Sequence, residues 1–430
     1  MFVGMDFGTT NSAVGVVKAD GAAEILSFAS LSGSSQTCRS MLAFEQTHRD
    51  SQRRLIPHIG QQAIDAYLHG DGECRLLQSF KSYLTSRSFT SASILNTTYS
   101  LEDLIALVVE RLRQTAEANG GSPVTKVVAG RPVRFVAEDG QIEDDFATSR
   151  LLQAFAKAGI PEVVFEYEPI AAAYYYERSL DHDETVLVAD FGGGTSDFCL
   201  VRLGPGRSRL NRPEDAILGT SGVGIAGDAF DRRIVQYGIA DFFGKHDSYR
   251  ADHKILPMPA WVYGKFERWH HIGFLNAPQT LRMLRGLHRY VGHPEQLDNL
   301  LTLIEHNLGY HLYRAVEQTK LELSHGHETV FRFDHDPIDI SRTITRSELE
   351  GWIGEELTDI ETCVEGLLET TGVSADKVDR VFMTGGSSLV PSVRAIFERR
   401  FGPERISAGG EFISVASGLA YRAREVFSRG

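Results

Sequence analysis

The chain has 430 residues, 42% of them hydrophobic and 23% charged, which is typical of a globular protein with about two to four domains. Its formal net charge of −13 argues against a nucleic acid or an anionic membrane surface as the main partner. No apolar run approaches the roughly 20 residues that span a bilayer, and no signal-peptide pattern opens the chain. The four cysteines form no C-x-x-C pair, so we expect no disulfide or zinc framework and a cytoplasmic location.

The first part of the chain alternates between strand and helix patterns. Short continuous apolar runs are typical of strands buried on both faces, and apolar residues repeating every three to four positions are typical of helices. In chain order we expect strands at Phe2–Met5 and Ala13–Val17, a helix at Leu101–Ala118, a strand at Lys126–Ala129 and helices at Gln141–Ala158 and from Glu168 onward. Ser100 and Asp103 form a capping-box pattern, and Gly159 is a helix stop signal.

The second part shows the same mixture. In chain order we expect strands at Val186–Ala189 and Phe198–Leu203, helices at Leu303–Ser324 and Ser347–Thr371, a strand at Arg380–Met383 and a helix at Val415–Phe427. Thr345 followed by Glu348 predicts a capped start for the helix that begins at Ser347, and Gly372 is a natural residue to end it. An α/β fold follows from these patterns.

Two features occur once in each half and indicate an internal duplication. The triplet D-F-G ends a predicted strand at Asp6 and again at Asp190, each time before a bend rich in glycine and threonine. The segments EPIAAAYYYER, from Glu168, and SVASGLAYRARE, from Ser414, both carry small residues that let helices approach closely. Ala-rich helices are also common in general. We therefore expect two lobes, residues 1–182 and 183–430, with the boundary near the acidic stretch DHDE.

A histidine-rich stretch sets residues 228–326 apart as an inserted helical subdomain. Its histidines are His246, His253, His270, His271, His288, His293, His306, His311 and His325. His325 and His327 are the nearest to a metal-ligand pair, but no H-E-x-x-H motif or cysteine partner accompanies them. Surface and packing histidines are therefore the favoured interpretation, and the role of the stretch stays open.

The two acidic hairpins carry the chemistry. A glycine opens the backbone, so successive N–H groups and hydroxyls can bind phosphate oxygens. The residues with this property are Gly8, Thr9, Thr10 and Asn11 in the first turn and Gly192, Gly193, Gly194 and Thr195 in the second. Either turn alone could be a plain hairpin. Buried carboxylates are costly unless paired, however, so Asp6, Asp190 and Asp197 together indicate Mg²⁺ beside phosphates.

A third glycine-rich turn occurs in VFMTGGSSLVP. The predicted strand that ends near Met383 leads into Gly385, Gly386 and Ser387, and a helix is expected near Pro391. Backbone amides at such a turn attract phosphate or ribose oxygens. An ordinary strand-to-helix link is the alternative.

Other nucleotide motifs are weak or missing. Gly222, Gly224 and Gly227 make a literal G-x-G-x-x-G, which would belong to a Rossmann site only inside a βαβ unit. The sequence contains no G-x-x-x-x-G-K-[ST] phosphate loop. A protein kinase is excluded because the H-R-D and V-A-I-K motifs are lacking.

The motifs D-F-G-T-T-N-S, D-F-G-G-G-T-S-D, E-P-I-A-A-A and T-G-G-S-S, in this order, resemble the nucleotide-binding part of the DnaK-type heat-shock chaperones, the heat shock protein 70 family. The similarity runs from Val3 to about Arg424, and is strongest to the short YegD-like members. It implies the two-lobed fold of the actin/hexokinase-like ATPase superfamily, built from duplicated ribonuclease H-like domains with a nucleotide cleft between the lobes.

The resemblance also implies roles for individual residues. Asp6 and Asp190 would hold Mg²⁺ through water, and Lys81 in SFKSYLTSRSF would position the attacking water. Pro169 would be the relay proline. The implied catalytic residues are Lys81, Glu168, Asp190, Thr195 and Asp197. The implied nucleotide contacts beyond the two hairpin turns are Gly227, Asp228, Glu317, Lys320, Ser324, Gly385, Gly386 and Ser387. Taken alone, Lys81 could be a solvated charge, and Glu317 with Lys320 could be a surface pair.

Three positions depart from the family pattern. Leu321 and Leu389 stand where the family usually has arginines, and only Glu411 lies near Phe412, where the family usually has an aspartate. An arginine can stack on a planar base and a leucine cannot. These departures leave open whether ATP is preferred over other nucleotides. No peptide-binding domain follows the last predicted helix, so we do not expect the two-domain coupling of the family.

The leading hypothesis is a chaperone-like protein that binds ATP or ADP with Mg²⁺ and hydrolyses ATP slowly as a conformational switch toward a protein partner. One alternative is a phosphotransferase acting on a small metabolite or sugar, which needs a base beside a substrate hydroxyl. Another is a nucleotide-dependent binding or filament protein without enzymatic activity, which the leucines at 321 and 389 favour. Partner, hydrolysis rate and oligomeric state do not follow from the sequence.

Overall fold

The computed structural model describes residues 1–18, 20–30, 33–49, 52–69, 74–137, 140–209, 213–410 and 413–428. Glu411 and Phe412, one of the three departures from the family pattern, lie outside these residues. The chain forms two compact units: residues 1–226, 359–389 and 393–430 make the first, and residues 227–358 with 390–392 make the second. In the described part of the chain, no helix is long and apolar enough to cross a membrane.

The N-terminal hairpin forms the centre of a mixed sheet in the first unit. In spatial order its strands are β13 (Glu162–Tyr167), β12 (Lys126–Arg131), β1 (Val3–Phe7), β2 (Asn11–Val17) and β3 (Ala23–Ile25), with β6 (Cys38–Arg39) also pairing with β2. β1 runs parallel to β12 and antiparallel to β2, and β12 runs parallel to β13. Val3, Met5 and Phe7 are buried, as expected for a central strand.

A second sheet of the same unit repeats this topology. Its spatial order is β22 (Ile406–Ala408), β21 (Arg380–Thr384), β14 (Glu184–Phe191), β15 (Ser196–Leu203) and β16 (Ile217–Val223). β14 runs parallel to β21 and antiparallel to β15, as β1 does to β12 and β2. The predicted α/β fold and its internal duplication are therefore confirmed, and both central hairpins end in the D-F-G triplet.

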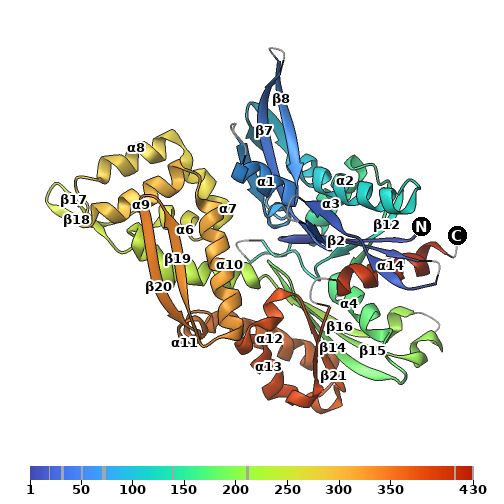
Figure 1. The fold of residues 1–430 in the computed structure, drawn as a ribbon. Coiled ribbons are helices and arrows are strands. Elements are labelled where there is room, and N and C mark those ends of the chain that lie inside the picture. Colours follow the sequence, from blue (N-terminus) through green and yellow to red (C-terminus); the bar gives the residue numbers. More distant parts are fainter. Residues whose placement is uncertain are drawn as a thin grey trace. The chain divides into compact units, whose positions relative to one another are not determined.

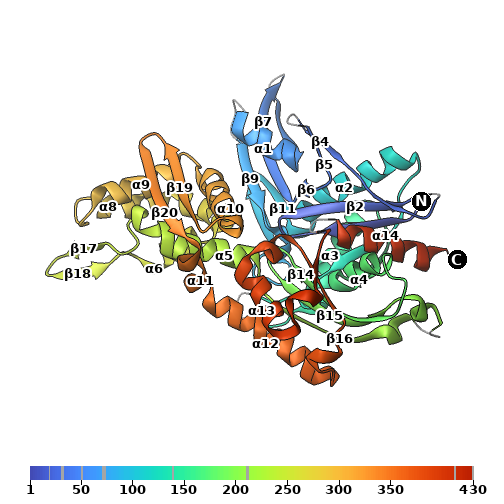
Figure 2. The same ribbon diagram turned by 60° about the horizontal axis from the view of Figure 1, so that its bottom comes forward.

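Two small-faced helices pack closely in the first unit. Figures 1 and 2 show α14 (Ser414–Phe427) beside α4 (Glu168–Glu177) and against β1 and β2. A Cβ atom on Gly418 would lie 1.7 Å from the carbonyl oxygen of Ala171, and one on Gly15 would lie 2.4 Å from that of Ala416. Backbones approach this closely only where side chains are absent, and the small residues noted in both segments provide that space.

The remaining elements of the first unit surround these sheets. Its other helices are α1 (Gln61–His69), α2 (Leu101–Gly120), α3 (Asp144–Lys157), most of α12 (Gly354–Thr371) and α13 (Pro391–Phe401). Its smaller sheets pair β4 (Phe28–Ser30) with β5 (Gly33–Ser35), β7 (Met41–Arg49) with β8 (Gln52–Ile59) and β9 (Cys74–Gln78), and β10 (Ser91–Ile94) with β11 (Thr97–Ser100). The predicted capping box of Ser100 and Asp103 is present at α2. The helix expected from Gln141 begins later, at Asp144.

The second unit is mainly helical. It contains α5 (Gly227–Arg233), α6 (Ala260–Phe266), α7 (Trp269–Ile272), α8 (Pro278–Leu287), α9 (Pro294–Glu305), α10 (Gly309–His325) and α11 (Arg346–Trp352). Two hairpins complete it: β17 (Ser248–Ala251) with β18 (Lys254–Pro257), and β19 (Glu328–His335) with β20 (Ile338–Thr345). Phe243, Phe266 and Phe333 are among its fully buried side chains.

Two long helices predicted from the sequence are each divided in the structure. The helix predicted at Leu303–Ser324 is wrong, because α9 ends at Glu305 and α10 begins at Gly309. Asn307, between them, has φ of 55°, a left-handed conformation that ends helices. The helix predicted at Ser347–Thr371 is interrupted at Ile353. Its capping box at Thr345 and Glu348 is present, and Gly372 has φ of 66° as expected.

Candidate nucleotide site

The two D-F-G hairpins place their acidic residues at equivalent points. In the first hairpin Asp6 pairs with Ala13, and in the second Asp190 pairs with Asp197. Each carboxylate therefore lies near the end of its strand, just before a glycine-rich bend. In the second bend the Gly192 N–H donates a hydrogen bond of 2.9 Å to the carbonyl oxygen of Thr195. Both bends expose backbone without bulky side chains, which suits close approach of a ligand.

The two bends lie side by side within the first unit. A Cβ atom built on Gly194 would lie 3.4 Å from the Thr9 hydroxyl oxygen, which is ordinary contact distance. Two bends that touch in this way can bind one ligand from two sides. The sequence predicted a shared ligand for the bends but could not predict their contact, because 185 positions separate Thr9 from Gly194.

Ser40 supports the first bend, and sequence reasoning missed it. Its hydroxyl donates a hydrogen bond of 2.7 Å to the carbonyl oxygen of Gly8 and lies 2.8 Å from the Ser12 hydroxyl. Its own N–H donates to the carbonyl oxygen of Thr10 over 2.9 Å. Both serine side chains are buried, so these bonds fix the bend. The only sequence signal was a serine just before the apolar run at residues 41–44, a pattern too common to single out.

A lysine and several carboxylates meet below the two bends. Lys81, on a short 3-10 helix at Phe80–Tyr83, places its Nζ 2.5 Å from Oε1 of Glu168, the first residue of α4. Both side chains are buried, as are Asp190 and Asp197, whereas Asp6 is half-buried. Sequence motifs 87 positions apart thus form one ion pair, which requires good geometry to offset the cost of burying both charges.

Burial and mutual repulsion raise the pKa values of these carboxylates. Burial, and then the charge of Glu168, raises the pKa of Asp6 to about 7, although Lys81 partly offsets this. The same two causes raise the pKa of Asp197 to about 7 and hold that of Asp190 well above its usual range. For Lys81 burial acts in the opposite direction, but Glu168, Asp6 and Asp197 outweigh it and raise the pKa of the ammonium group. The cluster thus has an excess of acid, which a bound cation would neutralise.

Asp197 is held in a fixed position. Its Oδ1 accepts a hydrogen bond of 2.7 Å from the Val133 N–H, and the Thr195 side chain also donates to its carboxylate. Gly222 leaves the necessary space, since a Cβ there would lie 2.6 Å from Asp197 Oδ1. Gly222 and Val133 were not predicted in this role.

The Rossmann alternative is not supported by this geometry. Gly222 lies in β16, which pairs antiparallel with β15 and forms an edge of its sheet. The helix that follows, α5, is only 7 residues long. The glycine pattern therefore does not belong to a βαβ unit of parallel strands.

The third glycine-rich turn lies next to the second hairpin. Thr384, at the end of β21, pairs with Asp190. Gly385 follows with φ of 84°, and a Cβ there would lie 2.1 Å from the carbonyl oxygen of Phe191. Only glycine fits this position. Gly386 and Ser387 begin the short helix Gly386–Leu389, so the predicted loop adjoins the acidic cluster.

The remaining predicted contacts lie in the second unit and form a group of their own. Lys320, on α10, donates from Nζ to Asp231 over 2.8 Å and to the carbonyl oxygen of Gly227 over 3.2 Å. Gly227 and Asp228 begin α5, and Asp231 lies one turn later. Burial raises the pKa of Asp228 to about 6 and that of Asp231 to about 7, against the lowering effect of Lys320. Asp231 was missed, although its spacing from Asp228 was visible.

The other residues of α10 lie near this ion pair in sequence. The Ser324 hydroxyl donates a 3.0 Å hydrogen bond to the carbonyl oxygen of Lys320, and Glu317 contributes to the raised pKa values of Asp228 and Asp231. Leu321 has 47% of its surface exposed, and Leu389, in the first unit, 37%. Both leucines thus present apolar surface to solvent where the family resemblance had led us to expect arginines.

The acidic residues do not form a direct metal cage. Among the described residues, no group of three or more histidine, cysteine or carboxylate side chains is arranged to hold a metal ion. Contact of Asp6 and Asp190 with Mg²⁺ through water stays a prediction, and Mg²⁺ commonly keeps part of its hydration shell. The excess of buried acid fits a hydrated cation.

Comparison with known proteins decides the family. Residues 2–256 and 304–424 match the family described as Hsp70 protein. The chain belongs to the Hsp70 family. Two relatives match almost the whole of this chain. The chaperone protein DnaK of Deinococcus proteolyticus is 25% identical to it over 440 residues, and that of Thermosipho melanesiensis is 24% identical over 431. Each comparison covers 98% of this chain but 58% of the relative, so the chain spans little more than half of their length.

Proposed function

We propose that this Hsp70-family chain binds ATP with Mg²⁺ and hydrolyses it slowly, and that the ATP and ADP states are read by a protein partner. The observation that carries the proposal is the buried Lys81–Glu168 pair with three further carboxylates below two adjoining glycine-rich bends. Phosphoryl transfer depends mainly on positioning and on charge stabilisation, and such a cluster supplies both.

The two bends would bind the phosphates. The backbone N–H groups and hydroxyls of Gly8, Thr9, Thr10 and Asn11 would donate from one side, and those of Gly192, Gly193, Gly194 and Thr195 from the other. Asp6 and Asp190 would hold a hydrated Mg²⁺, whose charge would neutralise the β- and γ-phosphates. Gly385, Gly386 and Ser387 would lie behind the ribose and α-phosphate, because Gly385 contacts the end of the second hairpin strand.

The buried cluster would act on water. Lys81 would orient the attacking water and stabilise the charge that develops on the transferred phosphoryl group. Glu168 holds the Lys81 ammonium in place over 2.5 Å. Asp197, fixed by the Val133 N–H, would accept the water proton, and Pro169 would relay the change in nucleotide state.

The adenosine contacts are proposed in the second unit. Gly227, Asp228, Glu317, Lys320 and Ser324 come from α5 and α10, which Lys320 joins through Asp231. Because Leu321 offers no guanidinium, we propose a weak preference for adenine over guanine. We further propose that residues 1–182 and 183–430 are the functional lobes, since each contributes one D-F-G hairpin.

Phosphate release by the purified chain tests hydrolysis. With MgATP the unaltered protein should release phosphate, and Lys81→Ala should reduce the rate by about 100-fold or more, as for removal of one charge-stabilising donor. Lys126→Ala, which removes an exposed lysine paired with Glu162, is the control and should leave the rate unchanged. Equal rates for Lys81→Ala and the unaltered chain would refute hydrolysis at this site.

A phosphotransferase is the second candidate. Asp197 is buried, fixed and next to the second bend, so it could accept a proton from a substrate hydroxyl as readily as from water. In that case one member of a panel of sugars and small alcohols should raise ATP consumption and yield a new phosphate ester. Consumption that no compound alters supports hydrolysis.

A further inference from the structure

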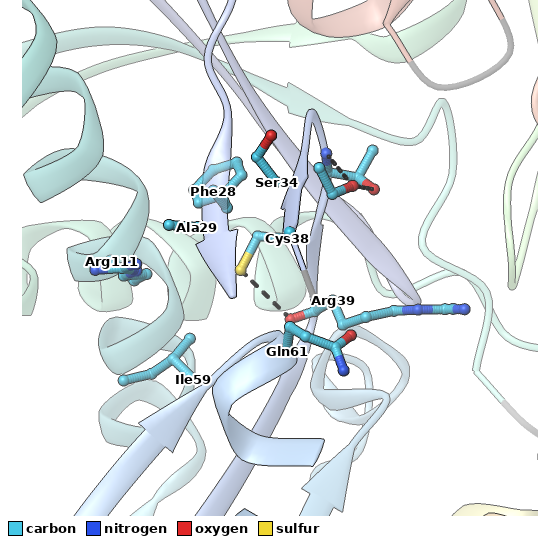
Figure 3. A pocket seen from close by; sticks show the side chains of 11 residues that line it. Phe28, Ala29, Ser34, Cys38, Arg39, Ile59, Gln61 and Arg111 are labelled. Atoms are coloured by element: carbon cyan, nitrogen blue, oxygen red, sulfur yellow. Dashed lines mark hydrogen bonds between the residues drawn. The ribbon is translucent and has the colours of Figure 1, made fainter. Parts of the chain in front are cut away.

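A pocket in the first unit lies apart from the residues proposed to bind the nucleotide. It has a volume of about 150 Å³ and is lined by the hairpin β4–β5, by β6, by the end of β8, by the start of α1 and by α2. Figure 3 shows Phe28, Cys38 and Ile59 around it, with Arg111 on α2 at one side. None of the lining residues belongs to the candidate nucleotide site.

Arg111 brings a positive charge to the wall of the pocket. Arg39 and Arg111 line it, and no carboxylate does. Figure 3 shows these arginines on opposite sides of Cys38, with the Arg39 side chain pointing away from it. In the described part of the chain, the Arg111 guanidinium has no hydrogen bond or ion pair, and its helix neighbours three and four positions away (Leu107, Val108, Gln114 and Thr115) carry no charge. A ligand would therefore meet an uncompensated guanidinium.

The thiol beside Arg111 does not neutralise it. Burial raises the pKa of Cys38 to about 12, although the nearby Arg111 lowers it, so the side chain stays a neutral thiol at physiological pH. Its Sγ contacts the Arg39 carbonyl oxygen at 3.6 Å, which satisfies its weak donor. The Arg111 charge thus remains available to an anion.

The other lining residues restrict the size and polarity of the ligand. Phe28, Ala29 and Ile59 contribute apolar surface, while Ser34 and Gln61 add groups that can form hydrogen bonds. A cavity of this volume accommodates a ligand about the size of benzene. A guanidinium binds a planar carboxylate through two parallel hydrogen bonds. Inorganic phosphate would leave the apolar walls uncovered.

We propose that this pocket binds a small carboxylate with an apolar body the size of one ring, and that Arg111 anchors the carboxylate. The site is additional to the proposed nucleotide site and does not depend on it. The two sites are joined through β6, because Arg39, which lines the pocket, pairs with Asn11 of the first bend.

Fluorine NMR titration of the purified full chain tests the proposal. The probes are para-fluorobenzoate and its neutral counterpart para-fluorobenzamide. The acid should bind saturably. The amide should bind at least about tenfold more weakly, which corresponds to losing one charge-assisted interaction. Because this comparison uses the unaltered chain, it does not require any variant to fold.

Variants identify the anchor. Arg111→Gln should weaken binding of the acid about tenfold and leave that of the amide unchanged. Arg113→Gln removes the same charge from the same helix outside the pocket and should change neither. These titrations are made without nucleotide, so their outcome is separate from that of the ATP hydrolysis assay.

Four results would overturn the proposal. These are no saturable binding of the acid, equal binding of acid and amide, an Arg111→Gln affinity equal to that of the unaltered chain, or displacement of the acid by inorganic phosphate at equal concentration. The last would indicate a general oxyanion site.

Discussion

In the part of the chain that the structure describes, Lys81 is the cation that acts on a group of four carboxylates, Asp6, Glu168, Asp190 and Asp197. Such an arrangement opposes folding, since each buried acid must be neutralised by a proton, the lysine or a bound cation. Structures keep this kind of arrangement at sites that need it for function. At the scale of single residues, the cluster is thus a reason to expect a ligand.

Replacement of Lys81 by methionine should therefore destabilise the protein without ligand. The side chains of Lys81 and Glu168 are only 8% and 10% exposed, so removing one partner leaves a buried charge. We expect a loss of about 3–5 kcal/mol in the free energy of unfolding, measured by urea titration at pH 7.5.

The double variant Lys81→Met with Glu168→Gln is the matched control. It removes both charges and should recover a large part of the loss, because breaking a buried pair costs more than replacing it. If the double variant is as unstable as the sum of its two single variants, the pair is not coupled and this interpretation of the cluster is wrong.

Among the elements, α14 is positioned by contacts that tolerate no additional atom. Gly418→Ala would place a methyl group 1.7 Å from the Ala171 carbonyl oxygen of α4, and the two backbones would have to separate. We expect a loss of about 3 kcal/mol or more in stability, at the upper end for overpacked sites. Thermal or urea unfolding measures it.

Gly366→Ala provides the matched control for that variant. Gly366 lies inside α12, and no atom lies within 4 Å of the position its Cβ would take. This substitution should stabilise the protein by about 0.5–1 kcal/mol, because alanine favours the helix. Similar losses for both glycines would show that close packing is not what fixes α14.

A pair of adjacent histidine rings should make the second unit sensitive to acid. The rings of His311 on α10 and His335 on β19 have centroids 4.5 Å apart. Burial, and then the charge of His335, lowers the pKa of His311 below 6.5. The folded chain therefore binds fewer protons than the unfolded chain just below pH 6.5, and stability should fall as the pH drops through this range.

His335→Gln tests this by removing the neighbouring charge. Urea midpoints at pH 7.5 and 5.5 should differ less in this variant than in the unaltered chain, whereas His253→Gln, at an exposed position, should not alter the difference. An unchanged acid loss in His335→Gln would show that the ring pair is not its source.

Local sequence signals predicted the positions of helices and strands better than the points where the long helices are interrupted. Apolar runs gave the central strands, and Ser100 and Thr345 gave helix starts, because these patterns depend on neighbours in sequence. The break at Asn307 was overlooked because the amphipathic pattern continues across it, although asparagine tolerates its left-handed conformation. The interruption at Ile353 had a local signal that was overlooked, because Gly351 and Gly354 flank it and glycine is unfavourable inside a helix.

At the scale of the whole molecule, the same hairpin arrangement occurs twice. Both large sheets of the first unit have a central D-F-G hairpin with two strands continuing in parallel on one side and antiparallel pairing on the other. The sequence predicted this duplication from the repeated triplet, and much of the candidate site with it. Ser40 and Val133 could not be predicted, because their roles depend on contacts between distant segments.

Binding of MgATP should stabilise the folded chain as a whole. A ligand at 100 times its dissociation constant adds about 2.7 kcal/mol when it binds only the folded state. Thermal unfolding with MgATP should thus show a higher midpoint than with Mg²⁺ alone. In Lys81→Met the carboxylates depend more on the Mg²⁺ of the ligand for neutralisation, so MgATP should raise the midpoint of this variant by more than that of the unaltered chain. Identical midpoints with and without nucleotide would argue against a folded-state site.

The most direct test of the central claim is a crystal structure with Mg²⁺ and a nonhydrolysable ATP analogue. We expect density for the triphosphate in contact with the backbone at both Gly8 and Gly193, next to Lys81. Density that contacts only one of the two bends, or a nucleotide bound elsewhere, would contradict it.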